Sequence, residues 1–270
     1  MDKLLQSAIF SAISAGDEIL SVYGNHDLGI EYKQDDSPLT LADKKAHIAI
    51  VNGLRETGLP VLSEEGKTIP YQDRSRWELF WLIDPLDGTK EFIKRNGEFT
   101  VNIALIELGK PVIGVVYVPV TRALYYASAK IGSYKTSIDK DFIPGDINSI
   151  TEHAELLTDA QYPDIFTIVA SRSHSTKETE EFISRKEAEM GQIDLISAGS
   201  SIKLCLVAER KAHVYPRLAP TMEWDTAAGH AVALYANCSV DDYNTGTELT
   251  YNKENMLNPW FIVTQNINKR

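Results

Sequence analysis

The sequence predicts an α/β protein whose N-terminal half is of the α+β type. Three observations favour this class. A helical pattern of apolar residues opens the chain, closely spaced strand patterns occupy residues 79–127, and strand and helix patterns alternate between residues 165 and 264. With 270 residues, 43% of them hydrophobic, the chain is long enough for one large domain or two packed ones.

The first expected element is an amphipathic helix that ends near Tyr23, where Gly24 can stop it. Its apolar face consists of Leu4, Leu5, Ala8, Ile9, Ala12, Ile13, Ile19 and Leu20. Asp2 and the serines within this segment do not fit a secretory signal peptide, so we interpret it as the first helix of a cytoplasmic protein. A second helix is expected over residues 41–57.

Strand patterns follow. A short strand is expected at residues 61–62, and the continuous apolar run at 79–83 suits a buried central strand that stops at Asp84-Pro85. Three further strands between residues 99 and 127 are separated by turns that contain proline, which predicts an antiparallel meander.

Residues 130–163 are polar and irregular, and they are the best position for an internal boundary. We therefore expect an N-terminal half of residues 1–145 and a C-terminal half of residues 146–270, packed tightly as one functional unit. The C-terminal strands are expected at residues 165–170, 193–196, 213–215 and 260–264. The C-terminal helices are expected at residues 176–189, 201–209 and 225–236.

The charge balance narrows the classes of partner. The chain has 27 Lys and Arg against 38 Asp and Glu, a formal charge of −11, which disfavours binding to a nucleic acid polymer. A small anionic ligand stays compatible, since a few basic residues or metal ions can dominate one cleft. No segment approaches the roughly 20 apolar residues of a membrane-spanning helix. Cys205 and Cys238 lie among apolar residues, as buried thiols of a reducing compartment do.

Acidic residues stand where predicted strands end or predicted helices begin: Asp43, Glu64, Glu65, Asp84, Asp87 and Asp225. Taken singly, each is better explained as a helix N-cap or a solvated turn residue. Pro85 and Gly88 nevertheless favour a tight turn that brings Asp84 and Asp87 together after a buried strand. Two carboxylates about 5 Å apart repel by roughly 3 kcal/mol at an effective dielectric constant near 20. All-oxygen ligands without His or Cys are those that Mg²⁺ prefers.

Three segments of the sequence resemble motifs of the inositol monophosphatase superfamily of Mg²⁺-dependent, lithium-sensitive phosphatases. Glu64-Glu65 followed by WLIDPLDGT at residues 81–89 is similar to the first signature, and EWDTAAG at residues 223–229 to the second. SPLTLAD at residues 37–43 resembles a third motif. The three lie in the family order and enclose nearly the whole chain. The resemblance implies the layered αβαβα sugar-phosphatase fold and hydrolysis of a phosphate monoester.

The resemblance also implies the roles of the acidic residues. Two Mg²⁺ ions are expected on Glu64, Asp84, Asp87, Asp225 and the backbone carbonyl of Leu86. Asp43 would help to hold a third ion or its water. Thr89, within reach of Glu64 or Asp43, would orient and help to deprotonate the attacking water. The backbone N–H groups of Gly88 and Thr89 would bind the phosphate oxygens.

Within the superfamily, three segments resemble the branch of 3'(2'),5'-bisphosphate nucleotidases of the CysQ type. They are SRSH at residues 171–174, GSSIK at 199–203 and VYPR at 214–217. This implies hydrolysis of adenosine 3',5'-bisphosphate to AMP and phosphate, with 3'-phosphoadenylyl sulfate as a second substrate. It also places enzymes of this kind in nucleotide metabolism and sulfur assimilation. The residues expected to contact the substrate, beyond Gly88 and Thr89, are His174, Ser200, Lys203, Arg217 and Asp225.

Other interpretations stay open from the residues alone. Lys203 and Arg217 could neutralise the second phosphate of a bisphosphate nucleotide, but each is also an ordinary solvated or ion-paired residue. An inositol or sugar monophosphatase would use the same chemistry, and a non-catalytic binding protein could share the fold. The sequence leaves the oligomeric state open, and we favour a monomer. The resemblance likewise leaves peripheral association with the inner membrane open.

Overall fold

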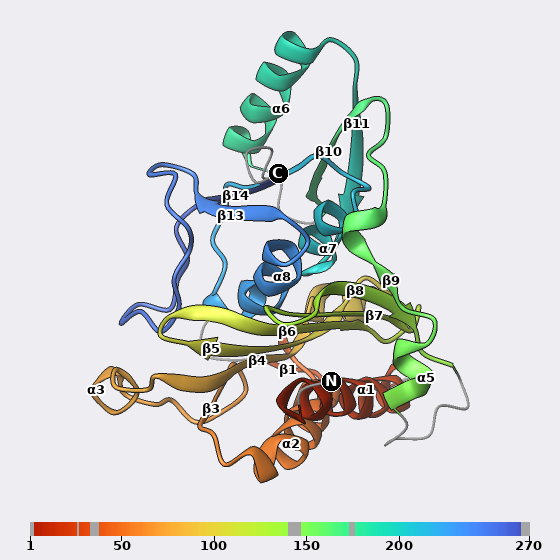
Figure 1. The fold of residues 1–270 in the computed structure, drawn as a ribbon. Helices are drawn as coiled ribbons and strands as arrows, with labels where there is room; N and C mark the ends of the chain where they lie inside the picture. The colour runs from red at the N-terminus through yellow and green to blue at the C-terminus, as the bar shows by residue number, and fades with distance from the viewer. Residues whose placement is uncertain (1–2, 26, 33–37, 140–146, 173–175, 266–270) are drawn as a thin grey trace.

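The protein forms five alternating layers of helices and sheets (Figure 1). A computed structural model describes residues 3–25, 27–32, 38–139, 147–172 and 176–265. The α-helices are α1 (Lys3–Tyr23), α2 (Leu41–Leu54), α3 (Tyr71–Arg74), α4 (Thr89–Ile93), α5 (Ile147–Thr151), α6 (Lys177–Met190), α7 (Ile202–Ala208) and α8 (Glu223–Leu234). Two 3-10 turns are η1 (Arg55–Thr57) and η2 (Leu157–Asp159).

The larger sheet has seven strands in the order β3-β4-β5-β6-β7-β8-β9. Their bounds are β3 (Val61–Ser63), β4 (Leu79–Asp87), β5 (Thr100–Glu107), β6 (Lys110–Val118), β7 (Ala123–Ser128), β8 (Gly132–Ser137) and β9 (Glu155–Leu156). β3 and β4 are parallel, and every other neighbouring pair is antiparallel. β1 (Glu31–Tyr32) and β2 (Pro38–Leu39) form a separate two-stranded ribbon.

The smaller sheet has five strands in the order β11-β10-β12-β14-β13. Their bounds are β10 (Phe166–Ser171), β11 (Ile193–Ala198), β12 (Val214–Arg217), β13 (Cys238–Asp242) and β14 (Phe261–Gln265). β10 is parallel to both of its neighbours, whereas β14 is antiparallel to β12 and β13. The α/β connections and the parallel strands at one edge match the alternating pattern of the sequence.

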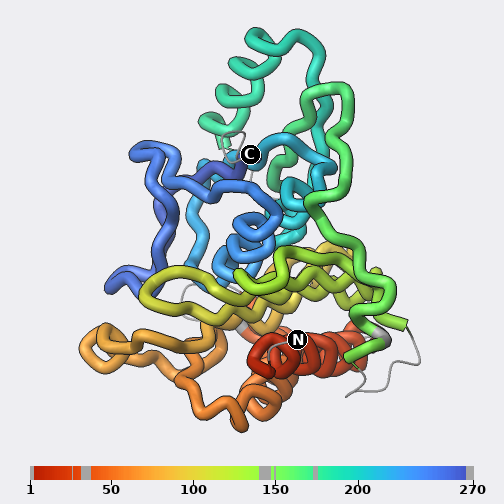
Figure 2. Tube along the Cα trace, in the orientation of Figure 1, coloured from red at the N-terminus to blue at the C-terminus, as the bar shows by residue number. Residues whose placement is uncertain are grey.

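The layers follow from which faces are apolar. Helices α1 and α2 cover one face of the larger sheet, and α7 and α8 lie between the two sheets (Figures 1 and 2). Helix α6 covers the outer face of the smaller sheet. Successive residues of β4 face opposite cores: Trp81 packs towards α1 and α2, whereas Leu82 packs towards α8. A strand buried on both faces needs the continuous apolar run that the sequence shows.

Close packing of α8 on the larger sheet depends on a glycine. A Cβ at Gly114 of β6 would lie 2.4 Å from the carbonyl oxygen of Ala228 and 2.6 Å from the Cβ of Ala231. No side chain fits between helix and sheet at this point. This approach keeps the first turn of α8 close to the ends of β4 and β5.

The layered fold is confirmed, but several details of the sequence-based expectations are wrong. β4 does not stop at Asp84-Pro85 but continues to Asp87, because a bulge lets the strand keep its pairing with β5. β8 lies inside the stretch expected to be irregular, because pairing with β7 overrides its polar composition. β13, with the buried Cys238 at its start, was missed altogether.

The division of the chain into two units stays a prediction. β9 extends the larger sheet to residue 156, and the smaller sheet begins at residue 166. One apolar core joins residues of both sheets with α7 and α8. Of the helices within the described ranges, none combines the length and apolar character needed to cross a membrane.

Candidate active site

The end of β4 carries two carboxylates on a bulge. Asp84 pairs with Asn102 and Asp87 with Thr100, so three steps along β4 match two along β5. The Leu86 N–H donates to Asp84 Oδ1 at 3.0 Å, which stabilises the turn between the two aspartates. Gly88 follows with φ +96°, a backbone conformation that side chains disfavour, and α4 begins at the next residue.

Two other segments bring carboxylates to the same place. Glu64 follows β3, the parallel neighbour of β4, and its N–H donates to the Ile83 carbonyl at 3.2 Å. Asp225 lies in the first turn of α8, where its Oδ2 accepts the Met222 N–H at 2.9 Å. Ligand oxygens of Glu64, Asp84 and Asp225 lie within 4.8 Å of one another. Residues about 160 positions apart in the sequence thus form one acidic cluster.

The acidic cluster is electrostatically unfavourable without a cation. Burial raises the pKa of Asp84 well above its usual value, and the nearby carboxylates of Glu64, Asp87, Asp225 and Asp43 raise it further. Burial also raises the pKa of Asp225, with Asp87 and Glu64 as the next causes. A divalent cation would neutralise this charge, and the donor set consists of oxygens only. The residues therefore fit a Mg²⁺ site.

Asp43 and Thr89 form a pair beside the acidic cluster. Asp43 Oδ2 accepts from the backbone N–H and the hydroxyl of Thr40, at 2.7 and 2.5 Å, in a capping box at the start of α2. Asp43 Oδ1 faces the Thr89 hydroxyl at 3.3 Å, and that hydroxyl also lies 3.4 Å from the Leu86 carbonyl oxygen. Of the two carboxylates expected near Thr89, the hydrogen bond goes to Asp43.

A pocket of about 280 Å³ joins the acidic residues to the basic ones. Its lining includes Glu64, Asp84, Leu86, Asp87, Gly88, Thr89, Ser200, Lys203, Arg217 and Asp225. Asp43 borders this set through its hydrogen bond with Thr89. His174 lies outside the described residues. The structure therefore brings together the predicted site residues that it describes.

Lys203 and Arg217 are buried cations. Lys203 is 4% exposed, and its ammonium lies 5.5 Å from the centre of the Tyr215 ring. Burial and the neighbouring Arg217 lower the pKa of Lys203 to about 8, while Asp87 opposes the shift, so the amine stays largely protonated at neutral pH. Arg217 is 9% exposed, and its guanidinium donates to the Pro220 carbonyl at 2.7 Å.

Sequence reasoning missed a polar group inside β5. Thr100 and Asn102 are both fully buried, and they occupy alternate positions at the start of an otherwise apolar strand. Alternation places both side chains on one face, which is the face that meets Asp87. Two polar residues at this spacing in an apolar run were the available signal.

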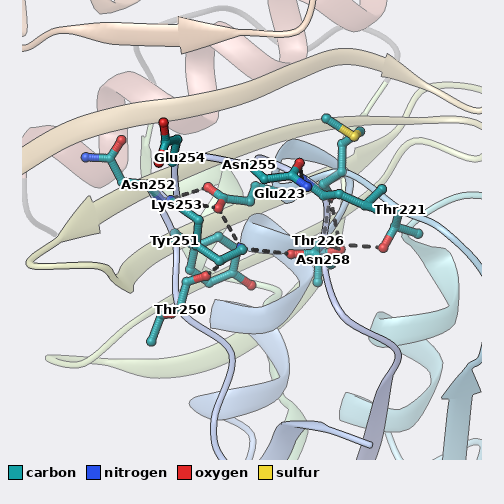
Figure 3. Close-up of polar contacts among 12 residues, drawn as sticks. Thr221, Glu223, Thr226, Thr250, Tyr251, Asn252, Lys253, Glu254, Asn255 and Asn258 are labelled. Carbon is teal, nitrogen blue, oxygen red and sulfur yellow. Dashed lines mark hydrogen bonds and ion pairs between the residues drawn. The ribbon is translucent and has the colours of Figure 1, made fainter. Parts of the chain in front are cut away.

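Helix α8 is anchored at its first residue by a second polar cluster (Figure 3). Glu223 is fully buried; its Oε1 accepts the backbone N–H and the ammonium of Lys253, at 3.0 and 2.6 Å. Its Oε2 accepts the Asn252 N–H at 2.7 Å. The Asn258 amide donates to the Met222 carbonyl and the Thr226 hydroxyl, at 2.8 and 3.0 Å (Figure 3). These bonds hold the turn that carries Asp225.

We predict that the metal-free protein loses stability as the pH rises. The folded-state pKa values of Asp84 and Asp225 are raised, so above the unfolded-state pKa, near 4, the unfolded chain releases protons that the folded protein keeps. The free energy of unfolding should therefore fall from about pH 5 to about pH 8 in EDTA. Urea unfolding at both pH values measures this change, and excess MgCl₂ should abolish it.

The variant Asp84→Asn is the control for this effect. It lacks one of the groups whose pKa is raised, so its free energy of unfolding in EDTA should depend less on pH. An identical pH profile for the parent and the variant would contradict the assignment to the acidic cluster.

Comparison with known proteins identifies the family. The model of the inositol monophosphatase family matches residues 1–266. The 3'(2'),5'-bisphosphate nucleotidase CysQ of Salmonella typhimurium is 46% identical over 266 residues, which cover 97% of this chain and 99% of that protein. The protein of that name from Escherichia coli K12 is 45% identical over 94% and 96% of the two chains.

Solved structures show the same fold as this chain. The crystal structure of CysQ from Bacteroides thetaiotaomicron has a TM-score of 0.88 and 51% sequence identity, covering 97% of each chain. The extragenic suppressor protein SuhB of Bartonella henselae shares the fold at 21% identity, with a TM-score of 0.74. The chain belongs to the inositol monophosphatase family.

Proposed function

We propose that this protein is a Mg²⁺-dependent phosphomonoesterase that hydrolyses adenosine 3',5'-bisphosphate to AMP and phosphate. 3'-Phosphoadenylyl sulfate is the second expected substrate. The observation that carries the proposal is one pocket lined both by the acidic cluster and by the buried cations Lys203 and Arg217. The relatives named 3'(2'),5'-bisphosphate nucleotidase support the substrate class.

The acidic residues would hold the metal. Glu64, Asp84 and Asp225 offer converging carboxylates. Asp87 and the Leu86 carbonyl, which line the same pocket, would complete the ligands of two Mg²⁺ ions. Asp43 would serve a third. Bound Mg²⁺ supplies a water of lowered pKa and stabilises charge on phosphate oxygens. Because Asp84 is buried among four carboxylates, a bound cation would stabilise its charged form.

Thr89 and Asp43 would act on the attacking water. The Thr89 hydroxyl can accept a hydrogen bond from that water while it donates its own proton to Asp43, so the pair orients a lone pair of the water. Asp43 or Glu64 would then take the proton. Gly88 and Thr89 line the same pocket, and a phosphate oxygen would accept from their backbone N–H groups. Asp225, which lines the same pocket, would also contact the substrate.

Lys203 and Arg217 would bind the phosphate that is not cleaved. The attraction between an anion and a buried ammonium or guanidinium is stronger than at the surface, because the surroundings have a low dielectric constant. We predict that Lys203→Ala and Arg217→Ala each raise KM for adenosine 3',5'-bisphosphate at least about 10-fold, since a hydrogen bond to a charged group contributes roughly 1.5–3 kcal/mol. KM for a monophosphate substrate should change far less. Equal changes for both substrates would contradict the second-phosphate assignment.

Phosphate release under one set of conditions tests the function itself. The purified protein with MgCl₂ is given adenosine 3',5'-bisphosphate, 3'-phosphoadenylyl sulfate or inositol 1-phosphate. The proposal expects turnover of the nucleotides and little of inositol 1-phosphate. The reverse order would favour an inositol monophosphatase, and no turnover of any phosphorylated metabolite would favour a binding protein. Inhibition by added LiCl and a cytoplasmic location are further expectations of the proposal.

A further inference from the structure

The loop between β11 and α7 places two hydroxyl groups on one carboxylate oxygen. Ser200 Oγ donates to Asp87 Oδ2 at 2.7 Å, and Ser201 Oγ lies 2.8 Å from the same atom. Asn102 Nδ2 lies 3.5 Å from it as a third, weaker donor. All three donors contact Oδ2, so Oδ1 is the oxygen that they leave for another ligand.

Ser201 is the N-cap residue of α7. A serine hydroxyl at this position usually accepts a hydrogen bond from a backbone N–H of the first helical turn. No such hydrogen bond forms here. The hydroxyl instead faces Asp87 Oδ2 and, at 2.5 Å, the Asp225 carbonyl oxygen. The Ser201 hydroxyl is therefore available to Asp87 and does not cap α7.

The buried polar pair of β5 orients Ser201. Asn102 Nδ2 donates to Ser201 Oγ at 2.9 Å, which occupies a lone pair of the hydroxyl and leaves its single proton for Asp87 Oδ2 or the Asp225 carbonyl oxygen. The Thr100 hydroxyl donates to Asn102 Oδ1 at 3.0 Å and so fixes the amide. Thr100, Asn102 and Ser201 are each at most 1% exposed. The hydroxyls of Thr100 and Ser200 also lie 2.5 Å apart, so this buried network reaches both serines.

The loop backbone is held from both sides. Ser200 has φ +52°, a left-handed conformation that a serine adopts only under constraint. Its carbonyl accepts from the Lys203 ammonium, and the Gly199 N–H donates to Glu98 Oε2 at 2.8 Å. Arg172 in turn binds Glu98 through two hydrogen bonds of 2.7 and 2.8 Å. The constraint places the Ser200 hydroxyl against Asp87.

We propose that Ser200 and Ser201 are positioning residues that orient Asp87 so that one carboxylate oxygen is presented to a divalent cation. This inference rests on the proposed function, in which Asp87 is a metal ligand. It gives the GSSIK segment a task in metal binding in addition to the substrate contact expected of Ser200. It also makes the affinity for the metal depend on a loop of the smaller sheet.

The test measures metal binding in the absence of substrate. Mn²⁺, which prefers the same oxygen ligands as Mg²⁺, is titrated into the parent and into Ser201→Ala and Ser200→Ala, and free Mn²⁺ is read from its EPR signal. Loss of a partner that orients a metal ligand should weaken one class of Mn²⁺ sites roughly 10-fold or more. Ser201→Thr keeps a hydroxyl and should restore most of the affinity.

A matched control separates the effect from general loss of a buried hydroxyl. Ser133 is fully buried in β8, and Ser133→Ala should leave Mn²⁺ affinity unchanged. Melting temperatures in EDTA establish that each variant is folded; should Ser201→Ala not fold, the partly exposed Ser200 provides the variant to be used.

Each outcome decides the inference. Unchanged Mn²⁺ affinity in both serine variants, with KM for the nucleotide raised, would assign the hydroxyls to the substrate and overturn it. A parent protein that binds Mn²⁺ and releases phosphate while the variants match it overturns this inference alone. A parent that binds no Mn²⁺ and releases no phosphate overturns the proposed function as well.

Discussion

Glu64→Ala and Asp87→Asn are each expected to reduce phosphate release by about 10³-fold or more while the protein stays folded. Glu64 belongs to the acidic cluster, and Asp87 lies close enough to raise the pKa of both Asp84 and Asp225. A metal ion contributes several kcal/mol of transition-state stabilisation, and each 1.4 kcal/mol corresponds to about a factor of ten in rate. Steady-state turnover of adenosine 3',5'-bisphosphate at saturating MgCl₂ measures the loss.

The neighbour of Glu64 provides the matched control. Glu65 stands next to it in the same turn but does not belong to the group of converging ligand oxygens, so Glu65→Ala should keep most of the activity. The stability of the variants supplies a second criterion. In EDTA, Asp87→Asn should melt at or above the temperature of the parent, since one repulsion on Asp84 is removed. Normal turnover by Asp87→Asn would refute the metal assignment.

Lys253→Met is expected to cost about 2–3 kcal/mol of unfolding free energy. The change leaves the Glu223 carboxylate, which is fully buried, with backbone N–H donors but no counter-charge. Removing one partner of a buried ion pair typically costs roughly 3–5 kcal/mol. We expect less because the Lys253 side chain is 30% exposed and water already screens part of the interaction. Urea unfolding of parent and variant measures the difference.

A double variant separates charge from packing in this cluster. Glu223→Gln removes the carboxylate charge, so Lys253→Met should destabilise the Glu223→Gln protein less than it destabilises the parent. The exposed pair of Lys177 and Glu181 on α6 is the control, and Lys177→Met should have no measurable effect. If Lys253→Met and Lys177→Met were equally harmless, Glu223 would not depend on its ion pair.

Much of the fold was predictable because its signals are local. The amphipathic face that ends at Tyr23 specifies a helix, and the apolar run at residues 79–83 specifies a strand, each from neighbouring residues alone. The errors occur where pairing with a neighbour decides. β8 has a polar sequence and becomes a strand because β7 offers it hydrogen bonds, and β13 becomes one beside β14.

For the candidate site, the sequence by itself determined which side chains are available. Carboxylates stand at strand ends and helix starts, with no His or Cys among them. Any metal site that they form therefore has oxygen ligands only. Tertiary structure alone decided which oxygens converge and which donors orient them. Glu64, Asp84 and Asp225 meet because β3 runs parallel to β4 and α8 packs closely over Gly114. Distances between segments far apart in sequence depend on packing, which no local pattern of residues records.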